Sequence, residues 1–221
     1  MTGDGPLNAQ GTMRQFAKPA LALVDSMRAA AADEPQRAIA FGGAPGSNSH
    51  QAAMQFAPDA LPLPCFSFED ALEAVDTGAA GCAMIPIENS VAGRVADIHH
   101  LLPDSGLHII AEHFQRVDHH LLGLPGTKLA DLTHVHSHVH AINQCREFIG
   151  KHGLESVVHA DTAGAAAEIA AGSDKTQGAI GSALAAALIE PLTVAAHAVL
   201  ERVPLAAGDT VLVMGAGPVG L

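Results

Sequence analysis

The chain has 221 residues, of which 48% are hydrophobic and 15% are charged, a balance that excludes a disordered polymer and supplies a buried core. Its 23 acidic and 11 basic residues give a formal charge of −12, so we expect no nucleic-acid partner and no membrane partner. Three scattered cysteines fit a reducing compartment rather than a disulfide framework. With no leader-like or bilayer-spanning apolar run recognised, the sequence predicts a cytoplasmic protein.

Residues 1–37 are expected to form an N-terminal extension, either a short helix that carries Leu21, Val24 and Met27 or a poorly ordered segment. From residue 38 onward, short apolar runs typical of strands alternate with segments typical of helices. The strands are expected at residues 38–41, 61–66, 82–87, 107–111, 118–124, 133–137, 156–160 and 178–181. The helices are expected at residues 49–56, 68–75, 95–102, 141–152, 163–171 and 183–189.

Several local signals refine these boundaries. Pro62 and Pro64 favour a strand at the edge of its sheet, because proline cannot donate a ladder hydrogen bond. Ser67 and Asp70 have the spacing of a capping box at the start of the next helix. Pro103 is expected to end the helix over residues 95–102.

The alternation of strands and helices predicts an α/β fold with mainly parallel sheets. Two such runs indicate two lobes, residues 38–112 and residues 113–189, with a ligand cleft beyond the carboxyl ends of the strands. Residues 190–221 form a tail of uncertain placement. Its apolar run over residues 210–214 is typical of a buried strand and could be added to the sheet of the first lobe.

Small polar residues follow several of the expected strands, where helices begin. Ser49 lies after the first strand, and further polar residues follow the strands that end near residues 87, 137 and 160. A single residue of this kind is commonly a helix cap. Several of them around one cleft would form an anion site, because helix N-termini carry partial positive charge.

Four motifs occur in a specific order. They are Gly-x-Pro-Gly-x-x-Ser-His-Gln-Ala-Ala from Gly43, Pro-Ile-Glu-Asn-Ser-x-x-Gly-Arg-Val from Pro86, Ser-His-x-x-Ala-x-x-Gln-Cys from Ser137, and Asp-Thr-Ala from Asp161. In this order, over residues 38–188, the chain resembles prephenate dehydratase. The resemblance implies a two-lobed α/β cleft like that of periplasmic binding proteins. It also implies conversion of prephenate to phenylpyruvate, carbon dioxide and water in phenylalanine biosynthesis, without a metal or organic cofactor.

Carried onto this chain, the resemblance implies a cleft in which each lobe contributes side chains. The residues expected to act in catalysis are Asn89, Ser90, Gln144 and Thr162. The residues expected to bind the substrate are Ser49, Gly93, Arg94, Ser137 and His138. Arg94 is a candidate partner for a substrate carboxylate, with an ion pair to Asp97 on the same helix as the alternative.

The reaction needs little chemical machinery. Prephenate already carries a carboxylate that can leave and a ring that becomes aromatic, so hydrogen-bond donors aimed at the departing hydroxyl would suffice. The family's catalytic region ends in Thr-Arg-Phe, whose threonine is the favoured proton donor, and these 221 residues contain no such motif. We therefore expect lowered activity, with a non-catalytic carboxylate-binding module as the alternative.

Residues 190–221 resemble a fragment of a zinc-type medium-chain alcohol dehydrogenase. Gly215-x-Gly217-x-x-Gly220 follows an expected strand, as a dinucleotide fingerprint does. The helix and the acidic residue that would complete a nucleotide site do not follow within the 221 residues, so an NAD-dependent oxidoreductase is the least favoured function. A homo-oligomer is compatible with the sequence, because such proteins commonly pair and the tail offers apolar surface.

Fourteen histidines raise the question of a metal site. His134, His136, His138 and His140 alternate and would share one face of a strand. Alternate positions on a strand are poor chelate geometry, and no cysteine or carboxylate has the matching spacing. The sequence therefore predicts no metal.

Overall fold

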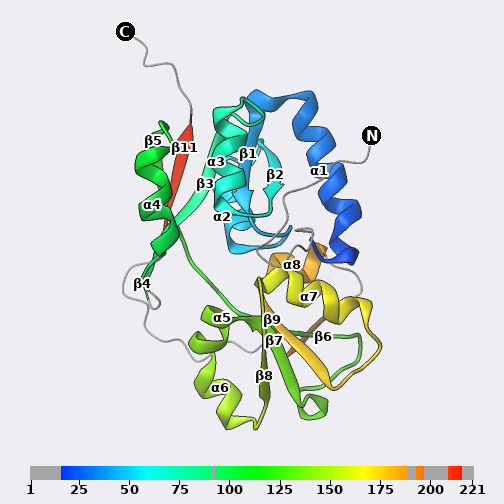
Figure 1. The fold of residues 1–221 in the computed structure, drawn as a ribbon. Coiled ribbons are helices and arrows are strands. Elements are labelled where there is room, and N and C mark those ends of the chain that lie inside the picture. The colour runs from blue at the N-terminus through cyan, green and yellow to red at the C-terminus, as the bar shows by residue number, and fades with distance from the viewer. Residues whose placement is uncertain (1–15, 91–92, 189–192, 197–208, 216–221) are drawn as a thin grey trace, which may run out of the picture.

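The computed structural model describes residues 16–90, 93–188, 193–196 and 209–215. These residues form two α/β lobes, one above the other, each with its own sheet and flanking helices (Figure 1). The two-lobed α/β architecture expected from the alternation of elements is confirmed.

The first lobe is a six-stranded sheet in the order β2-β1-β3-β11-β5, with β4 paired to β3 alone. Its strands are β1 (Ala38–Gly42), β2 (Leu61–Cys65), β3 (Cys82–Asn89), β4 (Gly93–Arg94), β5 (His108–Gln115) and β11 (Asp209–Gly215). Strands β2, β1 and β3 are parallel, whereas β11 runs antiparallel to both β3 and β5. The sheet is thus parallel in one half and antiparallel in the other.

The alternation of side chains along β1 explains the layers of this lobe. Ala38 and Ala40 pack into a cluster on the side of α3 (Phe68–Asp76) and α4 (Ala96–Asp104), whereas Ile39 and Phe41 pack on the side of α2 (Asn48–Phe56). Successive strand residues point to opposite faces, so β1 supplies both cores.

Two local signals at the start of the first lobe are confirmed. Strand β2, which carries two prolines, lies at the edge of the sheet. Ser67 Oγ accepts a hydrogen bond from the Asp70 N–H at 3.2 Å, and Asp70 Oδ2 accepts one from the Ser67 N–H at 3.1 Å. This reciprocal capping box satisfies two N–H groups at the start of α3.

The second lobe is a five-stranded sheet in the order β10-β6-β9-β7-β8. Its strands are β6 (His120–Gly123), β7 (His134–His138), β8 (Glu155–His159), β9 (Gln177–Gly181) and β10 (Thr193–Ala196), and its helices are α5 (Val139–Gln144), α6 (Arg146–Lys151), α7 (Thr162–Ala171) and α8 (Ala183–Leu188). Leu121 and Val135 belong to the core beneath α5 and α6, and Leu122 and Ala179 belong to the core beneath α7.

An N-terminal segment of residues 16–33, which we call the strap, contacts both lobes (Figure 1). It comprises a 3₁₀ turn (Lys18–Ala20), which packs on α7, and helix α1 (Leu21–Asp33), which packs beside β2. Phe16 and Val24 are buried in the same cluster as Leu122 of the second lobe, and Arg28 donates to the Pro64 carbonyl of β2 at 3.3 Å. Of the two alternatives for this segment, the helix is the one observed.

Several elements differ from the sequence-based expectation. In place of the single helix expected over residues 141–152, the structure has two helices, α5 and α6, which meet at Cys145. The backbone of Cys145, with φ of −99° and ψ of 7°, departs from helical geometry and ends α5. Pro103 lies inside α4 rather than after it. Strand β5 continues to Gln115, past the expected lobe boundary, and β10 was not expected.

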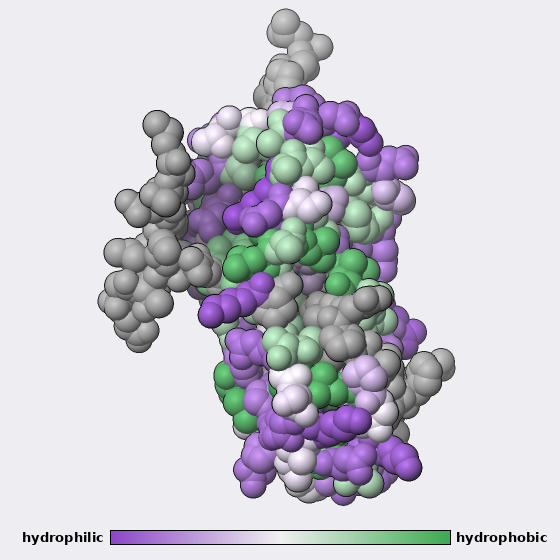
Figure 2. Space-filling model, turned by 90° about the vertical axis from the view of Figure 1, so that its right-hand side faces the viewer, coloured by the Kyte–Doolittle hydropathy of each residue, from purple (hydrophilic) through white to green (hydrophobic). Residues whose placement is uncertain are grey.

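Polar and apolar residues occupy different parts of the surface. On the side that carries α1, polar residues cover the two far ends of the molecule and apolar residues gather toward the middle (Figure 2). Within the described ranges, no helix has the length and hydrophobicity required to cross a bilayer.

Candidate functional site

The loop after β1 contains residues through which the first lobe contacts the second. Gly46 has a φ of +91°, and its N–H donates to His50 Nδ1 at 3.0 Å while its carbonyl accepts from Ser182 Oγ at 2.5 Å. A Cβ atom at Gly46 would lie 2.6 Å from the Cα of Ala185 in α8. We call this buried contact, made by Gly46, His50, Ser182 and Ala185, the seam.

His50 holds the first-lobe side of the seam. Its ring is 3% exposed and stacks on Phe41 with centroids 4.9 Å apart and planes 6° from parallel. Burial lowers the pKa of His50 to about 4, because the protonated ring would lose its hydration. A neutral ring is also the form in which Nδ1 accepts the Gly46 N–H.

Ser49 belongs to the same loop but lies inside the helix. Ser47 is the N-cap of α2, and its hydroxyl oxygen accepts from the His50 N–H at 3.2 Å. Ser49 is half-buried in the first turn that follows. Its expected contact with the substrate stays a prediction.

Asn89 ends β3 at the base of a hairpin. In this hairpin Asn89 lies opposite Gly93, and Glu88 lies opposite Arg94. Ser90 is exposed in the turn, and the φ of +79° at Gly93 is a conformation that glycine adopts without strain. The expectation that Arg94 stands on a helix with Asp97 is wrong, because Arg94 lies on β4 and is exposed.

Asn89 also joins the two lobes. Gln144 Nε2, on α5, donates to Asn89 Oδ1 at 3.0 Å. Gln144 Oε1 in turn lies 2.5 Å from Nε2 of His119, which stands between β5 and β6. We call this chain of three side chains the amide link. It brings together two of the four residues expected to act in catalysis.

The other second-lobe residues are placed differently from one another. Ser137 is fully buried, and its hydroxyl donates to the Ile180 carbonyl of β9 at 2.7 Å, so this O–H already has a structural partner. His138 is the N-cap of α5, where Nδ1 accepts from the His140 N–H at 3.3 Å. Burial, with the His140 ring adding to it, lowers the pKa of His138.

Thr162 is the first residue of α7. The residue before it, Asp161, is the N-cap, and its Oδ1 accepts from the Gly164 N–H at 2.7 Å. Thr162 therefore lies at the N-terminal end of a helix, as expected, but the capping itself is done by Asp161.

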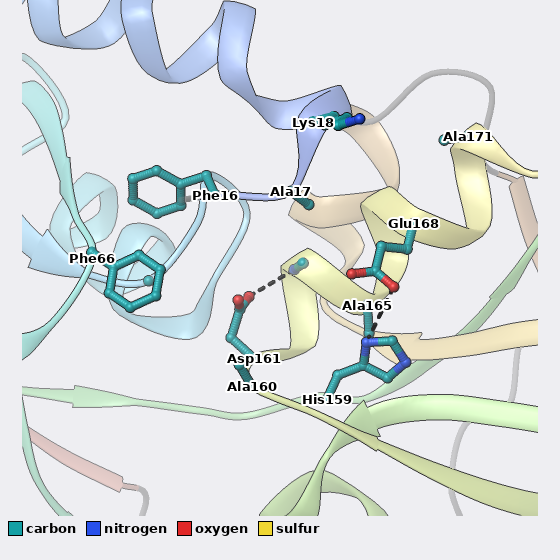
Figure 3. A pocket seen from close by; sticks show the side chains of 12 residues that line it. Phe16, Ala17, Lys18, Phe66, His159, Ala160, Asp161, Ala165, Glu168 and Ala171 are labelled. Carbon is teal, nitrogen blue, oxygen red and sulfur yellow. Dashed lines mark hydrogen bonds and ion pairs between the residues drawn. The ribbon is translucent and has the colours of Figure 1, made fainter. Parts of the chain in front are cut away.

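A cavity of about 630 Å³ lies beside these residues, between the strap and α7 (Figure 3). It is lined by Phe16, Ala17, Lys18, Gly43, Phe66, His159, Ala160, Asp161, Gly164, Ala165, Glu168 and Ala171. None of the nine residues expected in the substrate site is among them. Phe16 and Phe66 stand on one side of Asp161, and His159 and Glu168 lie on the other (Figure 3).

The histidines on β7 form part of a polar network rather than a chelate. His136 Nε2 lies 2.8 Å from Gln177 Oε1, and His136 Nδ1 lies 2.8 Å from His159 Nε2. Across the described residues, no three histidine, cysteine, aspartate or glutamate side chains gather closely enough to hold a metal ion.

Three residues of this region have no signal in the sequence. His119 is one histidine of an adjacent pair, Ser182 is one serine before a helix, and His159 ends a strand. Their partners lie 25, 136 and 23 positions away along the chain. Only the tertiary fold brings these partners into contact.

Comparisons with known proteins agree with the fold and with the four motifs. A family model described as prephenate dehydratase matches residues 39–202, about three quarters of the chain. The chain is 50% identical over 153 residues to a bifunctional N-acyl-homoserine lactone acylase/prephenate dehydratase of Komagataeibacter europaeus, which covers 69% of this chain and 54% of that protein. It is 37% identical over 162 residues to arogenate dehydratase/prephenate dehydratase 1 of Arabidopsis thaliana, which covers 73% and 41%.

Solved structures give the same result. Prephenate dehydratase from Arthrobacter aurescens, in complex with L-Phe, superposes with a TM-score of 0.74 at 31% identity, covering 83% of this chain and 61% of that one. The quorum-quenching acylase GqqA superposes with a TM-score of 0.73 at 44% identity, covering 83% and 66%.

The match has two boundaries of note. The chain spans about half or less of the length of these curated relatives. The family model reaches residue 202, so it overlaps the first part of the segment that resembles an alcohol dehydrogenase, whereas Gly217 and Gly220 lie outside the described residues. Over most of its length, the chain belongs to the prephenate dehydratase family.

Proposed function

We propose that this chain catalyses the prephenate dehydratase reaction, in which prephenate yields phenylpyruvate, carbon dioxide and water. The single observation that carries the proposal is the amide link. Two side chains expected from the family motifs to act in catalysis, Asn89 and Gln144, come from opposite lobes and meet at 3.0 Å. Substrate held at this junction would contact both lobes.

The amide link has a direction. Because Gln144 donates its Nε2–H to Asn89, its Oε1 is the acceptor, and His119 donates through Nε2–H. Asn89 accepts through its carbonyl oxygen within the link, so a hydrogen bond that its amide donated to a substrate would come from the N–H groups. Hydrogen bonds that run in the same direction along a chain strengthen each other. The link would therefore strengthen a hydrogen bond from the Asn89 amide to a negatively charged oxygen of the substrate.

This arrangement suits the departing group. As the carboxylate leaves as carbon dioxide, its bonding electrons enter the ring, and the C–O bond breaks to expel hydroxide. An amide N–H lowers the energy of the developing hydroxide by hydrogen bonding, without transferring its own proton. The proton that completes the water molecule then comes from solvent.

The missing proton donor sets the expected rate. General acid catalysis contributes on the order of 10²- to 10⁴-fold, and these 221 residues lack the Thr-Arg-Phe motif that would supply the acid. We therefore expect turnover below that of family members with the motif by about this factor. The alternative, a non-catalytic carboxylate-binding module, is favoured by the same absence.

The test is phenylpyruvate formation from prephenate, followed by ultraviolet absorbance, with the full chain and its variants. We expect Asn89→Ala and Gln144→Leu each to lower kcat/KM at least tenfold, because each removes a member of the amide link. Asn143→Ala, at the exposed neighbouring position on α5, is the matched control and should stay within twofold.

Two further measurements decide between the functions. The free energy of unfolding should change by less than about 1 kcal/mol in Gln144→Leu, because the residue is only half-buried. If calorimetry detects binding of prephenate while the ultraviolet assay detects no turnover, the carboxylate-binding module is the function. Unchanged turnover and unchanged affinity in both Asn89→Ala and Gln144→Leu would refute the placement of the site at the amide link.

Three expectations beyond the reaction stay predictions. The cytoplasmic location is checked by cell fractionation, and the homo-oligomer by sedimentation of the full chain. Residues 190–221 resemble a fragment of an alcohol dehydrogenase, and nucleotide binding by this segment is tested by adding NADH, where we expect no change in fluorescence.

A further inference from the structure

The strap contacts both lobes through one short stretch of chain. We propose that it is a releasable brace, which is anchored in the first lobe, docks on α7 of the second lobe and, while docked, limits the tilt of one lobe against the other. The inference does not depend on the proposed dehydratase reaction, because it concerns only the relative placement of the lobes. The family model matches the chain from residue 39 onward, so the strap lies outside the matched residues.

One face of α1 reaches the cores of both lobes. Leu21 and Val24 belong to the same core as Leu122 of the second lobe, and Val24 is fully buried. Ala31, seven residues after Val24, is buried in the first-lobe core that contains Leu72. Residues seven apart lie on the same side of an α-helix, about 10 Å apart along its axis. The backbone hydrogen bonds of the helix set this rise, so α1 fixes the distance between its two contacts.

The first lobe holds the strap more firmly than the second lobe does. The chain runs from α1 through Pro35–Arg37 directly into β1, and Arg28 Nε donates to the Pro64 carbonyl of β2 at 3.3 Å. Within the described ranges, no hydrogen bond or ion pair joins residues 16–24 to the second lobe. The contact with α7 is therefore apolar and non-directional, and it is the end of the strap that dissociates first.

The contact with α7 also buries little surface. The 3₁₀ turn that packs on α7 contributes Ala17 and Ala20, and the facing helix is rich in buried alanines. Phe16 adds a large ring that is 9% exposed, and a cavity of about 630 Å³ lies beside the contact, between the strap and α7. Small side chains bury little apolar area, and atoms that line a cavity lack partners on one side, so the docked strap is held by a modest margin.

The strap and the amide link lie on opposite sides of the seam. The sheet order places β1 between β2 and β3, and the three strands are parallel, so their carboxyl ends share one edge. The strap lies beside β2, the seam follows β1, and Asn89 ends β3. In Figure 1, α1 lies on the right and α5, which carries Gln144, lies on the left. The seam fixes the separation of the lobes at one place but not their tilt about it.

The docked strap limits this tilt. When the second lobe tilts about the seam, it must either pull Phe16 and Val24 out of their shared core or stretch α1, and both cost free energy. Once the strap is undocked, neither restraint acts, so the lobes sample a wider range of angles. The contact between Asn89 and Gln144 then holds over only part of that range. The strap thereby couples an N-terminal segment to the opposite side of the junction between the lobes.

Pulsed electron paramagnetic resonance measures the tilt as a distance between two spin labels in the full chain. The labels are attached at Asp97→Cys on α4 and Glu147→Cys on α6, which are exposed positions in different lobes, on the left in Figure 1. The labelled parent also carries Cys82→Ala. Cys65 and Cys145 are kept, because burial raises the pKa of both thiols to about 12 and leaves them unreactive.

We expect one narrow distance distribution in the parent. Val24→Asp places a carboxylate in the core that the strap shares with the second lobe, and Phe16→Ala removes the large ring from it. In both variants, amide hydrogen exchange of residues 16–24 should become at least tenfold faster, and the distribution should broaden by more than about 2 Å. Ser26→Asp adds the same charge at an exposed position of α1, so this matched control should change neither quantity.

Two outcomes would overturn the inference. Unchanged exchange of residues 16–24 in both variants would show that the strap is not released. Faster exchange with an unchanged distance distribution would show that the lobes hold their angle without the strap. Phe16→Ala decides the question even where Val24→Asp does not fold, because Phe16 precedes the helix and alanine leaves no charge in the core. The measured quantity is a distance, so the outcome is independent of whether the chain turns over prephenate.

Discussion

The two lobes meet at the seam and at the amide link, and the two contacts are built differently. The seam uses the backbone of Gly46 with His50, Ser182 and Ala185, and all four residues are buried. The amide link joins three polar side chains that are only half-buried. A buried contact that leaves no room for another atom fixes the lobes, whereas a half-buried chain of polar side chains lies where a ligand can reach it. Changes at the seam should therefore affect stability first.

The largest effect is expected at Gly46. In Gly46→Ala the new Cβ would meet the Ala185 backbone at 2.6 Å, and φ is +91°, so we expect a loss of about 3 kcal/mol in the free energy of unfolding. Gly78→Ala is the matched control, because φ there is +77° but no atom lies within 4 Å, and it should cost about 1 kcal/mol. Chemical denaturation measures both, and equal losses would show that the close approach to α8 is not a constraint.

The next effect is a pH dependence at the seam. His50 has a pKa of about 4 in the folded chain and about 6.5 when unfolded, so the unfolded state binds the proton more readily. The stabilisation is complete above pH 6.5 and is lost as the pH falls from 6.5 through 4, by about 3 kcal/mol in all.

The contribution of His50 to this pH dependence is isolated by a variant that lacks its imidazole ring. His50→Gln should start less stable and should lose less stability than the wild type between pH 6.5 and pH 4.5, as followed by urea denaturation. Parallel curves for the two proteins would exclude His50 as the source.

The smallest effect is expected from Ser182→Ala. The variant loses the O–H donor to the Gly46 carbonyl and the acceptor of the Ala185 N–H at 2.9 Å, which together contribute about 1–2 kcal/mol. Ser105→Ala removes a similar pair of bonds at the half-buried end of α4 and should cost less. Thermal unfolding compares the two variants. An equal or greater loss of stability in Ser105→Ala would show that the Ser182 hydrogen bonds contribute no more than those of an ordinary helix cap.

Much of the fold is predictable because its signals are local. The capping box of Ser67 and Asp70 and the prolines of β2 act within a few residues, so their outcome can be foreseen. The break between α5 and α6 at Cys145 has no glycine or proline to mark it. Arg94 lies on β4, which has only two residues and so leaves no strand pattern in the sequence.

The site is less predictable than the fold. The family motifs single out Asn89 and Gln144, and the structure brings these two together, but His119 follows only from where the chain crosses between lobes. The burial of Ser137 also does not follow from the motif, because its hydroxyl donates to the Ile180 carbonyl of β9, 43 positions away, and its contact with substrate stays a prediction. Hydrogen-bond partners more than 20 positions apart depend on packing that no local pattern encodes.

The place of β11 in the first sheet has a consequence for synthesis. Strands β3 and β5 come from residues 82–115, yet the strand that lies between them comes from residues 209–215. On the ribosome, the second lobe must therefore emerge before the first can close its sheet. Until β11 is synthesised, the edges of β3 and β5 that it will join lack this strand in the nascent chain. A chaperone that binds nascent chains would protect these edges from pairing with other chains.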